Sequence, residues 1–88
     1  MKACFTQDDH KIVVEKKLSQ IQLIIDGKVC AEEKNFFKVQ NGDYDLKGKA
    51  ENPDGTISDI IVRFKHGLFI DEVTLFYNDK EIDTKQII

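Results

Sequence analysis

Two-residue turns between β-rich runs are the feature that most restricts the fold of this chain. One lies at Asp26-Gly27, after residues 21–25, and a similar joint lies at Asn78-Asp79, after residues 73–77. A two-residue loop that closes a tight hairpin needs a positive φ at its central positions, which Gly, Asn and Asp tolerate best. The positions of these turns therefore indicate a β-protein made of tight hairpins.

Alternation of apolar and polar residues supports this interpretation, most clearly over residues 44–50, where Tyr44, Leu46 and Ala50 fall on one side. Such a period of two indicates strands with one wet face. We expect about seven strands, no convincing helix, a flexible lead-in over residues 1–9 and a single domain over residues 10–88. A meander of this kind buries its apolar face by folding over, so the fold class predicted is all-β, a small antiparallel β-sandwich or partly closed barrel joined by tight hairpins.

Three local features leave alternatives open. Residues 35–39 either extend the preceding strand or pack as a separate segment. The alternation slips near residues 59–61, where a β-bulge would bring Ile57 onto one face with the later apolar residues of the strand. The segments 23–28 and 75–80 align without gaps, which indicates either convergent hairpin chemistry or duplication of a hairpin unit.

Charge and composition exclude several classes of function. The 88 residues carry a net charge of −3, with lysines interspersed among acids, whereas nucleic-acid binders present a basic face. We therefore expect no nucleic acid and no membrane surface as a partner. The longest apolar runs have three residues, far below the roughly 20 of a spanning helix. Lysine and isoleucine enrichment with a single arginine hints at a bacterial source, and the chain is expected to be cytoplasmic.

The residue types that carry chemistry are sparse and poorly spaced. Cys4, His10, Cys30 and His66 are zinc-ligating types, but no CxxC or HxxxH pair occurs, so we expect no metal and no cofactor. Cys30 is expected to be a small buried hydrophobe in a strand, and a disulfide with Cys4 is left open. The chain is predicted not to be an enzyme, and a thiol enzyme using Cys30 is held only as a hypothesis to test.

Aromatic residues give the better functional hint. Phe36-Phe37 places two rings on opposite faces if that segment is extended, and Phe76 is out of phase with its apolar neighbours. The contact candidates are therefore Phe36, Phe37, Phe76 and Ile88. The edge formed by residues 80–88 is a place where a peptide can add as a further strand. We expect a non-catalytic protein-interaction or self-association module whose partner is an unknown protein or a second copy, with a small-ligand (lipid or sugar) carrier as the alternative.

The order of several motifs resembles one known family. A His10-Lys11-Ile12 strand opening, the turn at residues 25–28, the basic-aromatic stretch at residues 35–38 and a later hairpin over residues 67–80 are similar to the repeated domain of Fas apoptotic inhibitory molecule, and in style to small bacterial β-proteins. Residues 46–65 have no clear match. The resemblance implies a compact antiparallel β-sandwich that acts through protein contacts, with no known catalytic centre.

Overall fold

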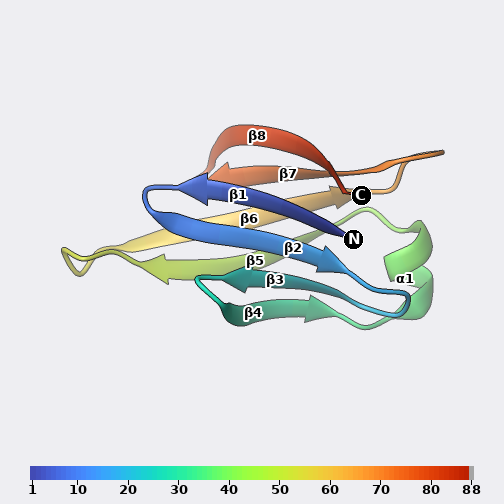
Figure 1. Cartoon of the computed structure of the whole chain (residues 1–88), viewed down its shortest axis with the longest axis horizontal. Coiled ribbons are helices and arrows are strands. Elements are labelled where there is room, and N and C mark those ends of the chain that lie inside the picture. Colours follow the sequence, from blue (N-terminus) through green and yellow to red (C-terminus); the bar gives the residue numbers. More distant parts are fainter. Residues whose placement is uncertain (88) are drawn as a thin grey trace.

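The computed structural model describes residues 1–87, apart from the side chain of residue 41, and these residues form eight β-strands and one short helix (Figure 1). In chain order the elements are β1 (Lys2–Gln7), β2 (His10–Lys16), β3 (Ile21–Ile25), β4 (Lys28–Glu33), α1 (Phe36–Asn41), β5 (Tyr44–Glu51), β6 (Ile57–Lys65), β7 (Asp71–Tyr77) and β8 (Lys80–Ile87). The predicted all-β class is confirmed.

The strands form two four-stranded antiparallel meanders, β1-β2-β3-β4 and β5-β6-β7-β8. Each sheet comes from one unbroken stretch of chain, and α1 lies in the connection between them (Figure 1). The two sheets face each other, with β5 close to β3 and β4 along one side and β1 close to β8 along the other. The described strands pair only within their own sheet, so the fold is a sandwich and not a closed barrel.

A single hydrophobic core fills the space between the sheets. The largest of its fully buried side chains are Phe64, Ile12, Ile21, Leu23, Ile60 and Leu75. They alternate along the strands with exposed residues, which is the pattern of a sheet with one wet face. Burying each of these side chains contributes about 1.5–3 kcal/mol relative to leaving it in water, and this term drives the two meanders together.

The expected lead-in over residues 1–9 is corrected by the structure, because most of it forms strand β1 and pairs with β2 along its whole length. Ala3 and Phe5 point into the core, and Asp8-Asp9 makes the connecting turn with positive φ at both residues. Asp tolerates this conformation better than most residues. An Asp-Asp pair carries neither glycine nor asparagine, so this turn gives a weaker sequence signal than Asp26-Gly27 or Asn78-Asp79.

The predicted bulge in the strand that contains residues 59–61 is also wrong. Strand β6 pairs with β5 in uninterrupted register, and Ser58, not Ile57, faces the core. Ser58 is tolerated there because its hydroxyl accepts hydrogen bonds from Tyr77 and Asn52, both at 2.9 Å. A buried polar group whose hydrogen bonds are all made costs little free energy. In the sequence, however, a serine predicts a position on the outer face of the strand.

Residues 36–41 form a helix, which corrects the expectation of no helix and, of the two alternatives for residues 35–39, agrees with a separate segment and not with an extension of the preceding strand. The Asn35 side chain caps the helix by accepting a hydrogen bond from the Lys38 N–H at 3.1 Å, as helix N-caps do. Val39 is fully buried and closes this end of the core, while the rings of Phe36 and Phe37 both remain exposed. The Phe pair therefore lies outside the core instead of on two faces of a strand.

The two sheets repeat one pattern of strand pairing. The second pair of strands in each sheet has the same register: Ile12–Ile25, Val14–Leu23 and Lys16–Ile21 in one, Ile60–Tyr77, Val62–Leu75 and Phe64–Val73 in the other. The register shifts between Leu23 and Ile24, and again between Leu75 and Phe76. These shifts fall at aligned positions of the two segments that match in sequence.

The aligned turns also make the same hydrogen bonds. Asp26 Oδ1 accepts from the Lys11 N–H at 2.9 Å, and Asn78 Oδ1 accepts from the Asp59 N–H at 2.8 Å. The backbone N–H of Asp26 donates to the Lys11 carbonyl, and that of Asn78 to the Asp59 carbonyl, both at 2.8 Å. The likeness of the two halves therefore extends from sequence to register and side-chain geometry. Each half can serve as an internal reference for the other.

Candidate binding surface at one end of the sandwich

The sandwich is elongated, and its two ends differ in chemistry. We call one end the turn end, which is formed by the four tight turns at residues 8–9, 26–27, 52–56 and 78–79 (Figure 1). We call the other the apolar end, which is formed by the β2–β3 connection (residues 17–20), the helical segment (residues 35–42) and the β6–β7 connection (residues 66–70). The chain terminus at Met1 also lies at the apolar end.

Most of the large hydrophobic side chains that the described residues expose gather at the apolar end. They are Met1, Leu18, Phe36, Phe37, Leu68, Phe69 and Ile70. Leu68 is 89% exposed and Phe69 is 92% exposed, so these two side chains make almost no contact with their own chain. Scattered apolar side chains are normal on a protein surface, whereas several gathered at one end make that end the candidate binding surface of this chain.

The two halves of the chain show that the β6–β7 connection is longer than its fold requires. The β2–β3 hairpin closes with a tip of two residues, Leu18-Ser19, because the backbone N–H of Lys17 still donates to the carbonyl of Gln20 at 2.8 Å. In the equivalent β6–β7 hairpin, Lys65 pairs with Glu72, so the tip consists of residues 66–71. The β2–β3 hairpin thus reaches the same strand register with a shorter tip. Closure of the β6–β7 hairpin therefore does not require the additional residues of its tip, among them Leu68 and Phe69.

The longer tip is held in one shape at its base. Asp71 Oδ1 accepts a hydrogen bond from the Gly67 N–H at 3.3 Å and lies 3.0 Å from His66 Nδ1. A Cβ atom on Gly67 would lie 1.9 Å from the Ile70 carbonyl oxygen, so only glycine fits this close approach of backbone. The His66 N–H donates to Asp43 Oδ1 at 2.8 Å. These contacts anchor the tip while Leu68 and Phe69 project from it.

A buried ion pair joins the two sheets directly below this tip. Lys16 on β2 is buried, and its Nζ donates to Asp71 Oδ2 at 2.7 Å. Burial alone would raise the pKa of Asp71, but the hydrogen bonds from Lys16 and Gly67 outweigh it and hold this pKa below its usual value. Asp71 therefore carries a negative charge near neutral pH, and it binds the β6–β7 tip and the opposite sheet at once.

The helical segment is tied to the β2–β3 tip on the same end. Gln40 Nε2 donates to the Leu18 carbonyl at 2.6 Å, and Lys38 pairs with Glu33 at 3.1 Å. The Phe36 and Phe37 rings meet edge to face with centroids 5.9 Å apart, a geometry that aromatic pairs favour. The exposed rings are therefore ordered by their neighbours.

A cavity of about 390 Å³ lies beside the β6–β7 tip. Its wall includes Met1, Phe69 and Ile87, which belong to segments far apart in the sequence. The cavity is open to solvent and mostly apolar. It extends the apolar end from the tip towards the beginning of β1.

The turn end holds a second bridge between the sheets, centred on a buried histidine. His10 Nδ1 lies 2.7 Å from Asp26 Oδ2, and His10 Nε2 lies 2.8 Å from Asn52 Oδ1. The hydrogen bonds to Asn52 and to Asp26 raise the pKa of His10 above its ordinary value. The same bond from His10, with the one from the Lys11 N–H, lowers the pKa of Asp26. This bridge is structural, because its polar atoms are paired with one another.

The cysteines lie elsewhere and are not where the sequence analysis expected. Cys4 and Cys30 are both exposed free thiols, so the expectation that Cys30 is buried is wrong. The reason is that β4 is an edge strand, and the Cys30 Cβ lies at the side of the sandwich against Gly48 on β5. Within residues 1–87, no group of three or more His, Cys, Asp or Glu side chains is placed to hold a metal ion.

The structure describes three of the four predicted contact residues and separates Phe76 from the other two. Phe36 and Phe37 lie together on the apolar end. Phe76 lies on the outer face of β7, where the Arg63 guanidinium covers its ring at 4.8 Å from the centroid. Ile88 lies outside the described residues. The tip at residues 68–70 is not among the predicted contact residues, although three consecutive apolar residues directly after His66-Gly67 were a signal for it.

Strand β8 lies at the edge of its sheet, as expected for residues 80–87. Its Lys85 side chain reaches across to β1, where Nζ donates to the Cys4 carbonyl and lies 5.1 Å from the Phe5 ring centroid. Lysine on an edge strand is a common means of blocking further strand addition. This edge is therefore less open than the apolar end, and peptide addition there stays a prediction.

Comparison with models of protein families, with curated proteins and with solved structures gave no match. The resemblance to Fas apoptotic inhibitory molecule therefore stays a prediction. Among the described residues, no helix is long and apolar enough to cross a membrane.

Proposed function

We propose that this chain is a non-catalytic protein-interaction module that binds through its apolar end. The observation that carries the proposal is the β6–β7 tip, residues 66–71, which exposes Leu68 and Phe69 almost completely although the equivalent hairpin of the first half closes with a tip of only two residues. Apolar side chains that the fold does not require reduce solubility, so their presence is explained by a partner that covers them. Aromatic anchors surrounded by polar residues are typical of such interfaces.

The test compares the chain with a variant of the tip and with a matched control. The double variant L68S/F69S removes both exposed side chains, while Ile57→Ser removes an apolar side chain that is 54% exposed at the turn end. Circular dichroism and melting temperature should be unchanged in both, because neither site belongs to the core. Affinity for a partner captured by the immobilised chain should fall at least about 100-fold in L68S/F69S, if each lost contact is worth about 1.4 kcal/mol. Equal affinity of all three proteins would refute the proposal.

The small-ligand carrier remains the second candidate because of the cavity beside the tip. Its volume of about 390 Å³ lies within the roughly 300–1,000 Å³ of ligand pockets, and Phe69 and Ile87 give it apolar walls. A thermal-shift panel of fatty acids and sugars tests this function. A rise in melting temperature that the L68S/F69S variant lacks would support it, and a flat response across the panel would exclude it.

A further inference from the structure

The ion pairs around the apolar end balance one another within a single chain. The rim consists of Lys17 with Glu15 at 3.7 Å, Lys34 with Glu32 at 3.4 Å, Lys38 with Glu33 at 3.1 Å and Arg63 with Asp45 at 3.0 Å. A surface of this kind has no strong field of one sign, so it neither attracts a polyanion nor repels a copy of itself. Its mixed charges can pair with the same mixed charges of a second copy.

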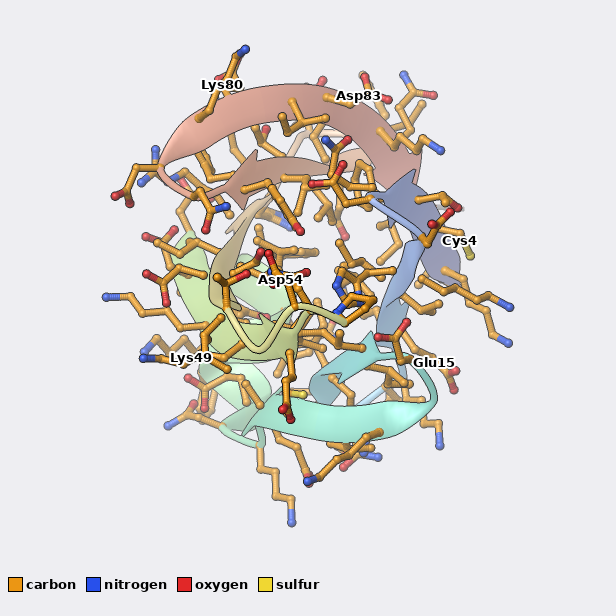
Figure 2. The ribbon with its side chains drawn as sticks, turned by 90° about the vertical axis from the view of Figure 1, so that its left-hand side faces the viewer. Cys4, Glu15, Lys49, Asp54, Lys80 and Asp83 are labelled. Carbon is orange, nitrogen blue, oxygen red and sulfur yellow. The ribbon has the colours of Figure 1, made fainter. Side chains whose placement is uncertain are left out.

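The turn end has the opposite property. Acidic side chains outnumber basic ones at the four turns and the adjacent strand ends, where Asp8, Asp9, Asp26, Glu51, Asp54, Asp59 and Asp79 face four lysines, Lys11, Lys28, Lys49 and Lys80, and leave an excess of negative charge. Figure 2 looks onto this end and shows the Asp54 turn at its centre, with charged side chains spreading outward around it. Two copies that approach through their turn ends repel each other. Charge therefore favours contact between copies through the apolar ends.

The exposed apolar surface at this end is of the size that a stable interface needs. Phe36, Phe37 and Phe69 expose 48%, 76% and 92% of their surface, which amounts to on the order of 400 Å² if a phenylalanine presents about 150–250 Å². Leu18, Leu68 and Ile70 add a comparable area. If one interface covers all six side chains, the total approaches the roughly 800 Å² that each partner buries in an interface of standard size.

We infer that the partner of the apolar end is a second copy of this chain, and that the two copies meet through the same patch across a two-fold axis. This inference rests on the proposed protein-interaction function and names its partner. A two-fold dimer uses one self-complementary patch on both subunits, which matches an apolar centre with a balanced rim. Head-to-tail contact would instead place the acidic turn end against apolar side chains, which costs desolvation of carboxylates without pairing them.

The test is the solution mass of the full chain, measured by light scattering and sedimentation over about 10 µM to 1 mM, the range in which weak association becomes visible. The wild type should move from 10.1 kDa to twice that mass. The variant L68S/F69S should raise the dissociation constant of the dimer at least about 100-fold, because both copies lose the two side chains, and Phe37→Ser should also raise it. The control Ile57→Ser should leave the constant unchanged. Circular dichroism of each variant verifies that it is folded.

Three results would overturn the inference, and they bear differently on the proposed function. A wild type that stays at 10.1 kDa throughout the range, yet binds another protein through Phe69, overturns the second copy as partner and leaves the interaction function standing. A dimer that L68S/F69S does not weaken shows that the copies meet elsewhere. A monomer that instead binds vesicles of phosphatidylcholine and phosphatidylserine through Phe69 overturns both proposals.

Discussion

Raising the pH above about 6.5 is expected to weaken the sandwich, because the pKa of His10 is raised above its ordinary value and the ring loses its proton as the pH passes through the raised value. Asn52 Nδ2 donates to Thr56 Oγ1 at 3.0 Å and to Ser58 Oγ at 2.9 Å, so Asn52 Oδ1 is the atom that faces His10. Since Asn52 Oδ1 and the Asp26 carboxylate are both acceptors, both ring nitrogens of His10 must donate. Only the protonated ring has two N–H donors.

The sign of the pH dependence follows from the raised pKa of His10. A group whose pKa is higher in the folded state stabilises fully below its unfolded value near 6.5, and this stabilisation is lost as the pH rises through the folded value. The free energy of unfolding then falls by at most about 1.4 kcal/mol per pH unit. Asp26 acts in the opposite range: its pKa is lowered, so its contribution is present above about 3.9 and is lost as the pH falls through the folded value.

The size of the effect follows from the two bonds that His10 makes between the sheets. A hydrogen bond to a charged group contributes about 1.5–3 kcal/mol, and His10 is only 7% exposed. The variant His10→Gln has a neutral side chain at this position, so its free energy of unfolding at low pH should be about 2–3 kcal/mol lower than that of the wild type. The difference from the wild type should shrink as the pH rises, because the wild type then loses its own charge.

Urea unfolding at several pH values, with an NMR titration of both histidines, measures these quantities. The matched control is His66→Gln, which changes the only other histidine, one that lies exposed at the apolar end. Wild type and control should lose stability between pH 6 and pH 8.5, whereas His10→Gln should give a flatter profile. A His10 signal that titrates at or below 6.5 would show that the ring is not held as a double donor.

Three further predictions concern the core and its bridges. Asp71→Asn should destabilise the fold by about 3–5 kcal/mol in urea unfolding, because it leaves Lys16 buried without its charge partner, and Lys16→Met in the same chain should recover part of this loss. Gly48→Ala should cost about 1–3 kcal/mol by the same assay, since the new Cβ would lie 2.8 Å from Ile25 Cδ1; an unchanged midpoint would contradict the close contact of β5 with the opposite sheet. Tyr44→Phe should be neutral or raise the melting temperature, because the Tyr44 hydroxyl is buried and has no hydrogen-bond partner among the described residues, and burial of such a group costs about 1–3 kcal/mol.

The hairpins were predictable because turn chemistry is local. Asp26-Gly27 and Asn78-Asp79 adopt positive φ at every central position, and they fix the register of the strands on both sides. The elements that sequence analysis missed depend on context instead. The short helix at residues 36–41 needs Val39 as a plug for the end of the core, and β1 needs an available edge of β2. Neither requirement is written in the local sequence.

The candidate surface was only half predictable for the same reason. The sequence pointed to Phe36 and Phe37, which are neighbours in the chain whatever conformation the segment adopts. Leu68 and Phe69 stand out only when the registers of both hairpins are known, because only these registers show that the β6–β7 tip is longer than closure of the hairpin needs. The bridge from His10 to Asn52 joins residues 42 positions apart in the chain, and no sequence pattern predicts a contact over that sequence separation.

Because each meander is one continuous piece, every strand-to-strand ladder is completed on one side of the helical segment or the other. A protease cut between residues 40 and 43 would sever no ladder, so the severed pieces should stay associated through their shared interior. The same topology lets two molecules exchange a whole meander, with the helical segment acting as the hinge. During synthesis, moreover, the first sheet is complete before the second sheet that covers it has been made. Until then the apolar face of the first sheet stays exposed unless the ribosome or a chaperone covers it.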